Sequence, residues 1–222
     1  MLGADIASWL PAIQAGALLV SALAWFAIAI VMLRLHDVIR GLAKTINDFS
    51  SGGPLNSNVR LITSRAVQSL NSAIASKGGK AAPMLVARTI TALVRPDAVR
   101  RLQGTHVLWV DDIPANNLYE RRAMEVLGIE VSTSPDTDDA LRQLAQGNVD
   151  LIISDMGRPS GKWAGLALLD VVKKHFPSMP FVIYTASNDR QHKAEAKQRG
   201  ASHATNDARD LMVVAVKLLN AR

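Results

Sequence analysis

The sequence of residues 105–222 predicts an α/β domain built on a doubly wound, parallel sheet of five strands. Short apolar runs alternate with amphipathic stretches along this segment, which is the pattern of repeated strand–helix units. The run 181–185 is almost continuously apolar, as expected for a strand that is covered on both faces. Gly128, Gly147 and Gly200 follow amphipathic stretches, at positions where helices commonly end. In a sheet of this kind, ligands bind beyond the carboxyl ends of the strands.

Each element is expected where its own pattern occurs, in chain order. The strands are expected at apolar runs, at residues 106–110, 129–132, 151–154, 181–185 and 202–205, the last being the weakest. The helices are expected at apolar residues with helical spacing, at residues 116–127, 136–146, 165–175, 190–199 and 208–220. The acidic cluster 136–139 is interpreted as the capped first turn of the second of these helices. The turn after the first strand lacks the glycines of a dinucleotide-binding loop, and no Gly-x-Ser-x-Gly elbow supports a hydrolase.

Polar side chains that suit phosphoryl chemistry stand at the ends of three expected strands. Asp111 and Asp112 follow the first strand, Asp155 follows the third, and Thr185 ends the fourth. Carboxylates are rare where buried strands end unless they bind a metal or take part in chemistry. Because the fold brings these ends to one rim, the pattern indicates a magnesium-assisted phosphoryl-acceptor site.

Four segments together carry a family resemblance: 107–112 (Val-Leu-Trp-Val-Asp-Asp), 155–159 (Asp-Met-Gly-Arg-Pro), 183–186 (Ile-Tyr-Thr-Ala) and the Gly200-Ala201 pair. In this order and spacing, residues 106–220 resemble the CheY-like receiver domain of bacterial response regulators, which has a flavodoxin-like fold. The resemblance covers just over half of the chain.

The resemblance implies a role for each residue of the site. Asp155 would be the phosphoacceptor, and Thr185 would hydrogen-bond the phosphoryl group. Asp111 and Asp112 would hold Mg²⁺ together with Asp155 and the backbone carbonyl of Gly157. Mg²⁺ would relieve the repulsion among three close carboxylates and neutralise phosphoryl oxygens. The resemblance implies a histidine kinase or phosphotransfer protein as partner, and no enzyme activity beyond self-phosphorylation and autodephosphorylation.

The sequence departs from the family pattern near the last strand. The lysine that receivers usually carry there is replaced by Asp207 or, with a slip of one residue, Asn206. The usual aromatic residue falls at Ala204, and His203 beside it is a weak substitute. Arg158 and Lys162 follow Asp155 and are expected to be solvated loop cations. These departures leave an alternative open, in which the domain is a pseudo-receiver that binds partners without being phosphorylated.

The N-terminal part predicts a membrane anchor. Residues 9–33 carry no charge and would span about 37 Å as a helix, enough to cross a hydrocarbon core of about 30 Å. Asp5 precedes this run, whereas Arg34, Arg40 and Lys44 follow it. The positive-inside rule then places the N-terminus outside and the receiver in the cytoplasm, at the bacterial inner membrane. A cleaved signal peptide is disfavoured because no Lys or Arg precedes the run.

The segment between anchor and receiver is basic and helical. Residues 34–104 contain 11 Lys and Arg against 3 Asp and Glu, whereas residues 105–222 contain 14 against 15. With few aromatic residues among these charges, anionic lipid is a better partner than nucleic acid. Amphipathic stretches at 35–49 and 59–73 favour helices, and the former makes a homodimer reasonable. Residues 76–80 are interpreted as a flexible linker, and short helices are expected at 83–94 and 96–102.

The expected organisation is therefore a transmembrane helix with a short tail at 1–35, a juxtamembrane region at 36–104 and a receiver at 105–222. The function expected is a membrane-anchored receiver of two-component signalling that acts through contacts with an unknown downstream protein. A further alternative is a membrane sensor or scaffold, in which the helical segment acts and the receiver only localises it.

Overall fold

The structure, a computed structural model, describes residue 32 and residues 54–221 except 81 and 188. Residues 54–222 form one compact unit. The expected transmembrane helix at 9–33 and its continuation to residue 49 lie outside the described residues, apart from residue 32. Within the part of the chain that is described, no helix has the length and apolarity needed to cross a membrane.

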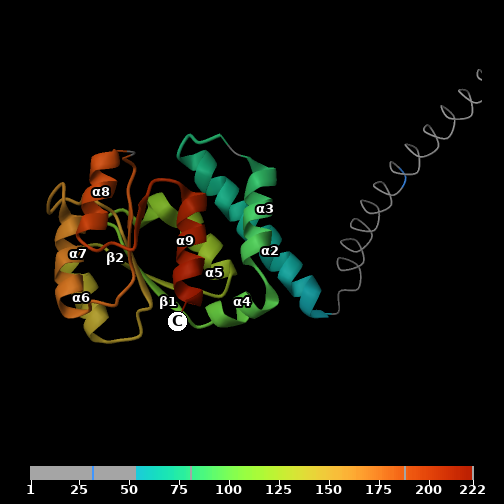
Figure 1. The fold of residues 1–222 in the computed structure, drawn as a ribbon, viewed down its shortest axis with the longest axis horizontal. Coiled ribbons are helices and arrows are strands. Elements are labelled where there is room, and N and C mark those ends of the chain that lie inside the picture. The colour runs from blue at the N-terminus through green and yellow to red at the C-terminus, as the bar shows by residue number, and fades with distance from the viewer. Residues whose placement is uncertain (1–31, 33–53, 81, 188, 222) are drawn as a thin grey trace, which may run out of the picture. The chain divides into compact units, whose positions relative to one another are not determined.

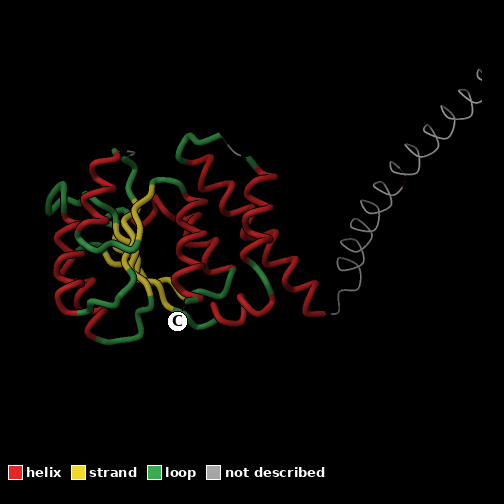
Figure 2. The backbone as a smooth tube through the Cα atoms, viewed as in Figure 1, coloured by secondary structure: helices red, strands yellow, loops and turns green. Residues whose placement is uncertain are grey.

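A five-stranded parallel sheet forms the centre of this unit, as predicted. Its strands are β1 (His106–Val110), β2 (Glu130–Ser134), β3 (Leu151–Ser154), β4 (Phe181–Tyr184) and β5 (His203–Thr205). They lie in the order β2-β1-β3-β4-β5, so the chain winds in both directions from β1. Figure 2 shows the strands in yellow, with helices on both sides of them. β1, β3 and β4 are buried along almost their whole length, which explains why their sequences are almost entirely apolar.

Alternate side chains of β1, β3 and β4 enter two separate cores. One face of the sheet is covered by α6 (Thr137–Ala145), α7 (Ala164–His175) and α8 (Arg190–Gln198). The other face is covered by α5 (Leu118–Val126) and α9 (Ala208–Asn220). Before α5, the short 3-10 helix η1 (Pro114–Asn117) occupies the start of the helix expected at 116–127. Asp136 caps α6 by accepting a hydrogen bond from the Asp139 backbone N–H at 2.8 Å, as the acidic cluster predicted.

Three further helices extend the second core. They are α2 (Pro54–Ser76), α3 (Pro83–Leu93) and α4 (Pro96–Leu102). Their fully buried side chains join those of α5 and α9 in one cluster, and include Ala66, Leu70, Ala73, Val86, Ile90 and Leu102. The segment 54–104 thus packs against the α/β part and shares its core, instead of standing between domains as a separate linker region. The physical reason is that the apolar faces of α2 and α3 are too large to leave in water.

The expected linker at 76–80 is an ordered helix end. The backbone N–H of Gly78 donates to Ala75 and that of Gly79 donates to Ile74, at 3.0 and 2.9 Å. Gly78 has a φ of +72°, in the left-handed region that favours glycine after a helix. The glycines therefore end α2 and reverse the chain towards α3.

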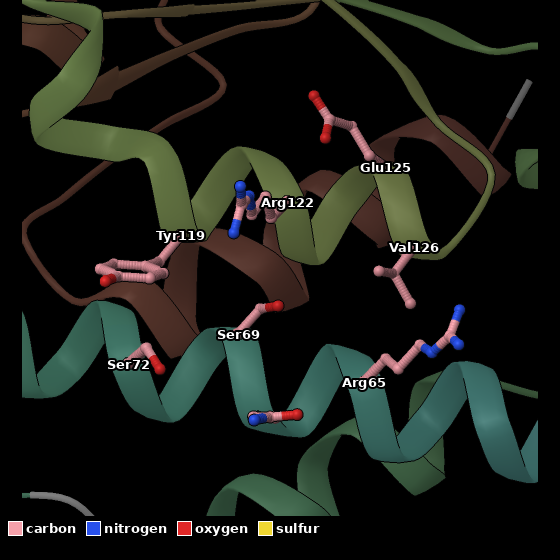
Figure 3. Close-up of a pocket in the computed structure, with 8 residues that line it drawn as sticks. Arg65, Ser69, Ser72, Tyr119, Arg122, Glu125 and Val126 are labelled. Atoms are coloured by element: carbon pink, nitrogen blue, oxygen red, sulfur yellow. The ribbon is translucent and has the colours of Figure 1, made fainter.

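A shallow hollow marks where α2 lies along α5. Side chains of both helices face it in Figure 3. Its volume is about 450 Å³, and it is lined by Arg65, Gln68, Ser69, Ser72, Tyr119, Arg122, Glu125 and Val126. Most of these side chains are exposed, so the hollow is open to solvent.

Candidate functional site

A polar cavity of about 920 Å³ opens at the carboxyl ends of β1, β3 and β4. All five residues predicted for the site line this cavity, namely Asp111, Asp112, Asp155, Gly157 and Thr185. The strand register accounts for this arrangement, because Val110 pairs with Ser154 and Ser154 pairs with Ile183. The residues that follow these strands must then emerge at one edge.

Asp111 is the most buried carboxylate of the cavity, with 5% of its surface exposed. One of its oxygens accepts a hydrogen bond from the Ile113 backbone N–H at 2.7 Å, and the other accepts one from the Asn117 side-chain amide. Burial raises the pKa of Asp111, and the charge of Asp112 raises it further. The Ile113 hydrogen bond and the charges of Lys77 and Arg158 act in the opposite direction.

Asp155 follows β3 and is held next to Asp111 by its own backbone. Its N–H donates to the Val110 carbonyl at 2.9 Å, which continues the pairing of β1 with β3 by one residue. Burial raises the pKa of Asp155, and the charges of Asp111 and Asp112 add to this effect. The Met156 backbone N–H and the charge of Arg158 oppose it. The pocket therefore concentrates negative charge where water is partly excluded.

This charge makes the pocket chemically suited to a hard divalent cation. Carboxylate and carbonyl oxygens are the ligands that Mg²⁺ prefers, and Asp111, Asp112, Asp155 and the backbone of Gly157 supply them. A cation would also relieve the repulsion among the carboxylates, which adds to the effect of burial in raising the pKa values of Asp111 and Asp155. In the described part of the chain, no three His, Asp or Glu side chains are already arranged as a metal-binding cluster. The Asp111 oxygens instead face Ile113 and Asn117.

Thr185 lies at the same edge, at the end of β4, and is 9% exposed. Its backbone N–H donates to the Thr205 carbonyl at 3.1 Å. Its hydroxyl oxygen accepts a weaker hydrogen bond from the Ser187 backbone N–H at 3.2 Å. The hydroxyl proton can therefore be donated to a ligand in the cavity.

Arg158 differs from the sequence expectation, because it is a buried cation and not a solvated one. Only 6% of its surface is exposed. Its guanidinium donates to Ser154 Oγ at 2.8 Å, Thr137 Oγ1 at 3.0 Å and the Ala164 carbonyl at 2.9 Å. Burial lowers the pKa of Arg158, while the charges of Asp155, Asp112 and Asp111 raise it. The arginine thus offsets part of the acidic charge of the pocket. By contrast, Lys162 is exposed, with its ammonium 5.2 Å from the centre of the Trp163 ring.

The end of β5 contributes no cation to the cavity. Asn206 lines the cavity and accepts a hydrogen bond from Lys193 Nζ at 2.9 Å. Asp207 caps α9 by accepting hydrogen bonds from the Arg209 and Asp210 backbone N–H groups at 2.8 and 3.0 Å. The role of Asp207 is therefore structural. His203 lies beside Asp210, with Nε2 2.8 Å from the carboxylate oxygen, so its ring is engaged on α9.

Two residues of the site were not predicted from the sequence. Lys77, at the end of α2, lines the cavity, although its segment was interpreted as a linker. The spacing Ala66, Leu70, Ala73 continues to Lys77, which indicates that the side chain follows the buried face of α2. Gly165, at the start of α7, lies so close to the Asp155 carbonyl that a Cβ atom would clash with it. The sequence did offer a signal, because a glycine within a helical pattern, where no turn requires it, indicates close packing of the backbone.

Known proteins are similar to this chain in its C-terminal half. Residues 107–205 match the family described as response regulator receiver domain. The DNA-binding transcriptional regulator NtrC of Salmonella typhimurium is 32% identical over 96 residues, which are 43% of this chain and 20% of NtrC. The nitrogen assimilation regulatory protein NtrX of Azorhizobium caulinodans is 30% identical over 95 residues, 43% of this chain and 21% of NtrX. The chain thus matches about a fifth of the length of these curated relatives.

A solved receiver domain protein from Clostridium thermocellum is 26% identical, with a TM-score of 0.47. The match covers 53% of this chain and 95% of that one.

Proposed function

Because residues 107–205 form a response regulator receiver domain of two-component signalling, we propose that this chain accepts a phosphoryl group on Asp155. The observation that carries the proposal is the shared cavity of Asp111, Asp112, Asp155 and Thr185, drawn from three strand ends. Receiver domains bind Mg²⁺ for phosphorylation, and the oxygens of Asp111, Asp112, Asp155 and Gly157 would hold it here.

The transfer requires only positioning and charge compensation from the protein. A carboxylate oxygen of Asp155 attacks phosphorus and forms a P–O bond, while the P–N bond of a phosphohistidine donor breaks. The electron pair of the broken bond remains on the imidazole nitrogen, which needs no proton from Asp155. With acetyl phosphate as donor, the P–O bond to acetate breaks instead. Mg²⁺ would neutralise the phosphoryl oxygens, and the Thr185 hydroxyl would donate a hydrogen bond to one of them.

The proposal includes a histidine kinase or phosphotransfer protein as donor and an unidentified protein as downstream partner. The chain has no activity on an external substrate in this proposal, only self-phosphorylation and loss of the phosphoryl group. The DNA binding stated in the names of the NtrC relatives is not included, because the match covers only about a fifth of those proteins.

The proposal also places the chain at the bacterial inner membrane. Its support is the sequence: residues 9–33 carry no charge, and Arg34, Arg40 and Lys44 follow them. A single-pass helix would then tether the receiver on the cytoplasmic side, with the N-terminus outside. Fractionation of cells that express the full chain tests this, because recovery of the chain in the soluble fraction would contradict a membrane tether.

Intact mass measurement tests the phosphoacceptor. The full 222-residue chain in detergent micelles is incubated with Mg²⁺ and acetyl phosphate, and it should gain the mass of one phosphoryl group. Asp155→Asn should gain none. Asp138→Asn, which removes an exposed carboxylate from α6, should be phosphorylated like the native chain. Absence of Mg²⁺-dependent mass gain in the native chain would refute the proposal.

A second candidate function, binding of a partner without phosphorylation, is favoured by one observation. Asp207 caps α9, and the partly buried Ala204 packs against the core on the α6–α8 face, so β5 presents neither a cation nor an aromatic switch. The same mass measurement separates the two functions, since this one predicts no phosphorylation of the native chain.

A further inference from the structure

Lys77 is the point at which the N-terminal helices meet the acidic cavity. Its ammonium lies 2.8 Å from Glu120 Oε1 and donates hydrogen bonds to Asn117 Oδ1 at 2.8 Å and to the Tyr184 hydroxyl at 3.0 Å. It also lies 4.2 Å from the centre of the Tyr184 ring. These partners come from α5, η1 and β4, so Lys77 joins the end of α2 to three elements of the receiver.

The contacts of Lys77 continue to the carboxylates of the site. Asn117, whose amide oxygen accepts from Lys77, donates with its amide nitrogen to Asp111. Asn117 is 5% exposed, so its amide has few alternative partners. Lys77 itself is 37% exposed, because its head reaches the solvent-filled cavity and not the core. The lysine thus contacts Glu120 of α5 and lines the same cavity as Asp155.

Only two cationic side chains line this cavity in the described part of the chain, Lys77 and Arg158. The guanidinium of Arg158 is buried and already donates hydrogen bonds to Ser154, Thr137 and the Ala164 carbonyl. Lys77 has a flexible side chain, so its ammonium can exchange a hydrogen bond to a neutral acceptor for one to an anionic acceptor. The amide oxygen of Asn117 is such a neutral acceptor.

We propose that Lys77 is the cationic ligand of a phosphoryl group on Asp155, supplied by a helix outside the α/β fold, so that phosphorylation strengthens the packing of α2 on the receiver. This inference rests on the proposed function of Asp155. When the phosphoryl group is present, the ammonium keeps its ion pair with Glu120 and transfers one N–H donor from Asn117 to a phosphoryl oxygen. Because linkage is reciprocal, a contact that holds the phosphoryl group through α2 also holds α2 to the receiver.

The test must separate this role from simple neutralisation of Glu120, whose carboxylate is 1% exposed. Lys77→Met alone would leave that carboxylate buried without its cation. The informative variant is therefore Lys77→Met combined with Glu120→Gln, which removes the whole ion pair. Lys77→Arg is the conservative variant. Lys80→Met is the control, because it removes an exposed lysine three residues further along the chain.

The measurement is calorimetric titration of the full chain in detergent micelles, first with Mg²⁺ and then with trifluoroberyllate at saturating Mg²⁺. The double variant should bind trifluoroberyllate about tenfold more weakly or worse, the loss expected for one charge-assisted hydrogen bond, and bind Mg²⁺ within about twofold of the native chain. Lys77→Arg should stay within about threefold for trifluoroberyllate, and Lys80→Met should be unchanged. Equal trifluoroberyllate affinity in the double variant and the native chain overturns the inference. So does a parallel loss of Mg²⁺ and trifluoroberyllate binding that Lys77→Arg does not restore, because that result indicates a structural role alone.

Hydrogen exchange tests the coupling to α2. Trifluoroberyllate should slow exchange of the Gly78 and Gly79 amides, which close the end of α2, in the native chain but not in the double variant. Equal slowing in both chains overturns the coupling. The two proposals fail differently. If the native chain gains no phosphoryl mass and binds no trifluoroberyllate, both the phosphorylation of Asp155 and the role of Lys77 are refuted. If the native chain is phosphorylated and binds trifluoroberyllate, and the double variant binds it with equal affinity, only the role of Lys77 is refuted.

Discussion

Replacement of Leu70 by alanine tests whether α2 belongs to the folding unit of the receiver. Leu70 is fully buried in the cluster shared with α5 and α9. The substitution removes about three methylene equivalents, worth about 2.4 kcal/mol at roughly 0.8 kcal/mol each. The cavity left behind adds to this, so the free energy of unfolding should fall by about 3–4 kcal/mol. For a unit of this size, the midpoint of thermal unfolding should then fall by about 6–16 °C.

The assay follows the fluorescence of Trp109, which is fully buried in β1 and packs edge-to-face on Tyr184 with ring centres 5.8 Å apart. Trp9, Trp25 and Trp163 are replaced by Phe, so that the signal reports the sheet alone. Gln68→Ala, on an exposed position of α2, is the matched control and should change the free energy of unfolding by less than about 0.5 kcal/mol. If Leu70→Ala left the Trp109 transition where it is in the native chain, α2 would not share the receiver's cooperative unfolding and the reasoning would be refuted.

Three further predictions concern the site and its supports. Gly165→Ala should place a methyl group against the Asp155 carbonyl, lowering the free energy of unfolding by about 1–3 kcal/mol and slowing phosphorylation of Asp155, whereas Ala167→Gly on the exposed side of α7 should leave phosphorylation unchanged. Burial raises the pKa of Asp155, so the folded chain holds that proton more tightly and loses stability as pH rises through the raised pKa. Without Mg²⁺, Asp155→Asn should therefore raise the melting midpoint at pH 7, and the difference should shrink towards pH 4; a lower midpoint for this variant at pH 7 would contradict the assignment. Asp207→Lys removes the cap of α9 and should cost about 1 kcal/mol in urea unfolding, while Asp207→Asn, which can still cap, should cost much less.

The sheet and the acidic site could be predicted because their determinants are local. A buried parallel strand must be apolar along its length, and a polar residue that follows it must appear at the sheet's edge. Asp111, Asp155 and Thr185 follow from these two rules alone. The capping role of Asp207 was also within reach, since it directly precedes the apolar pattern of the last helix.

Arg158 and Lys77 could not be placed in the same way, because their environment is made by distant segments. Arg158 follows Asp155 in a loop, and its acceptor Thr137 lies 21 positions earlier in the chain. Lys77 precedes two glycines, which suggested a flexible linker, and its partner Tyr184 lies 107 positions later. The sequence shows that a residue is charged, but only the packed structure shows whether hydrogen-bond acceptors surround it.

The common core of α2, α3, α4 and the α/β part has a practical consequence for anyone who trims this protein. A fragment that starts at residue 105 would remove the helices that pack on α5 and α9 and would open the shared core to water. It would also leave the Glu120 carboxylate without a counter-ion. Such a fragment should aggregate and precipitate, whereas one that starts at Pro54 retains the helices that cover this apolar surface.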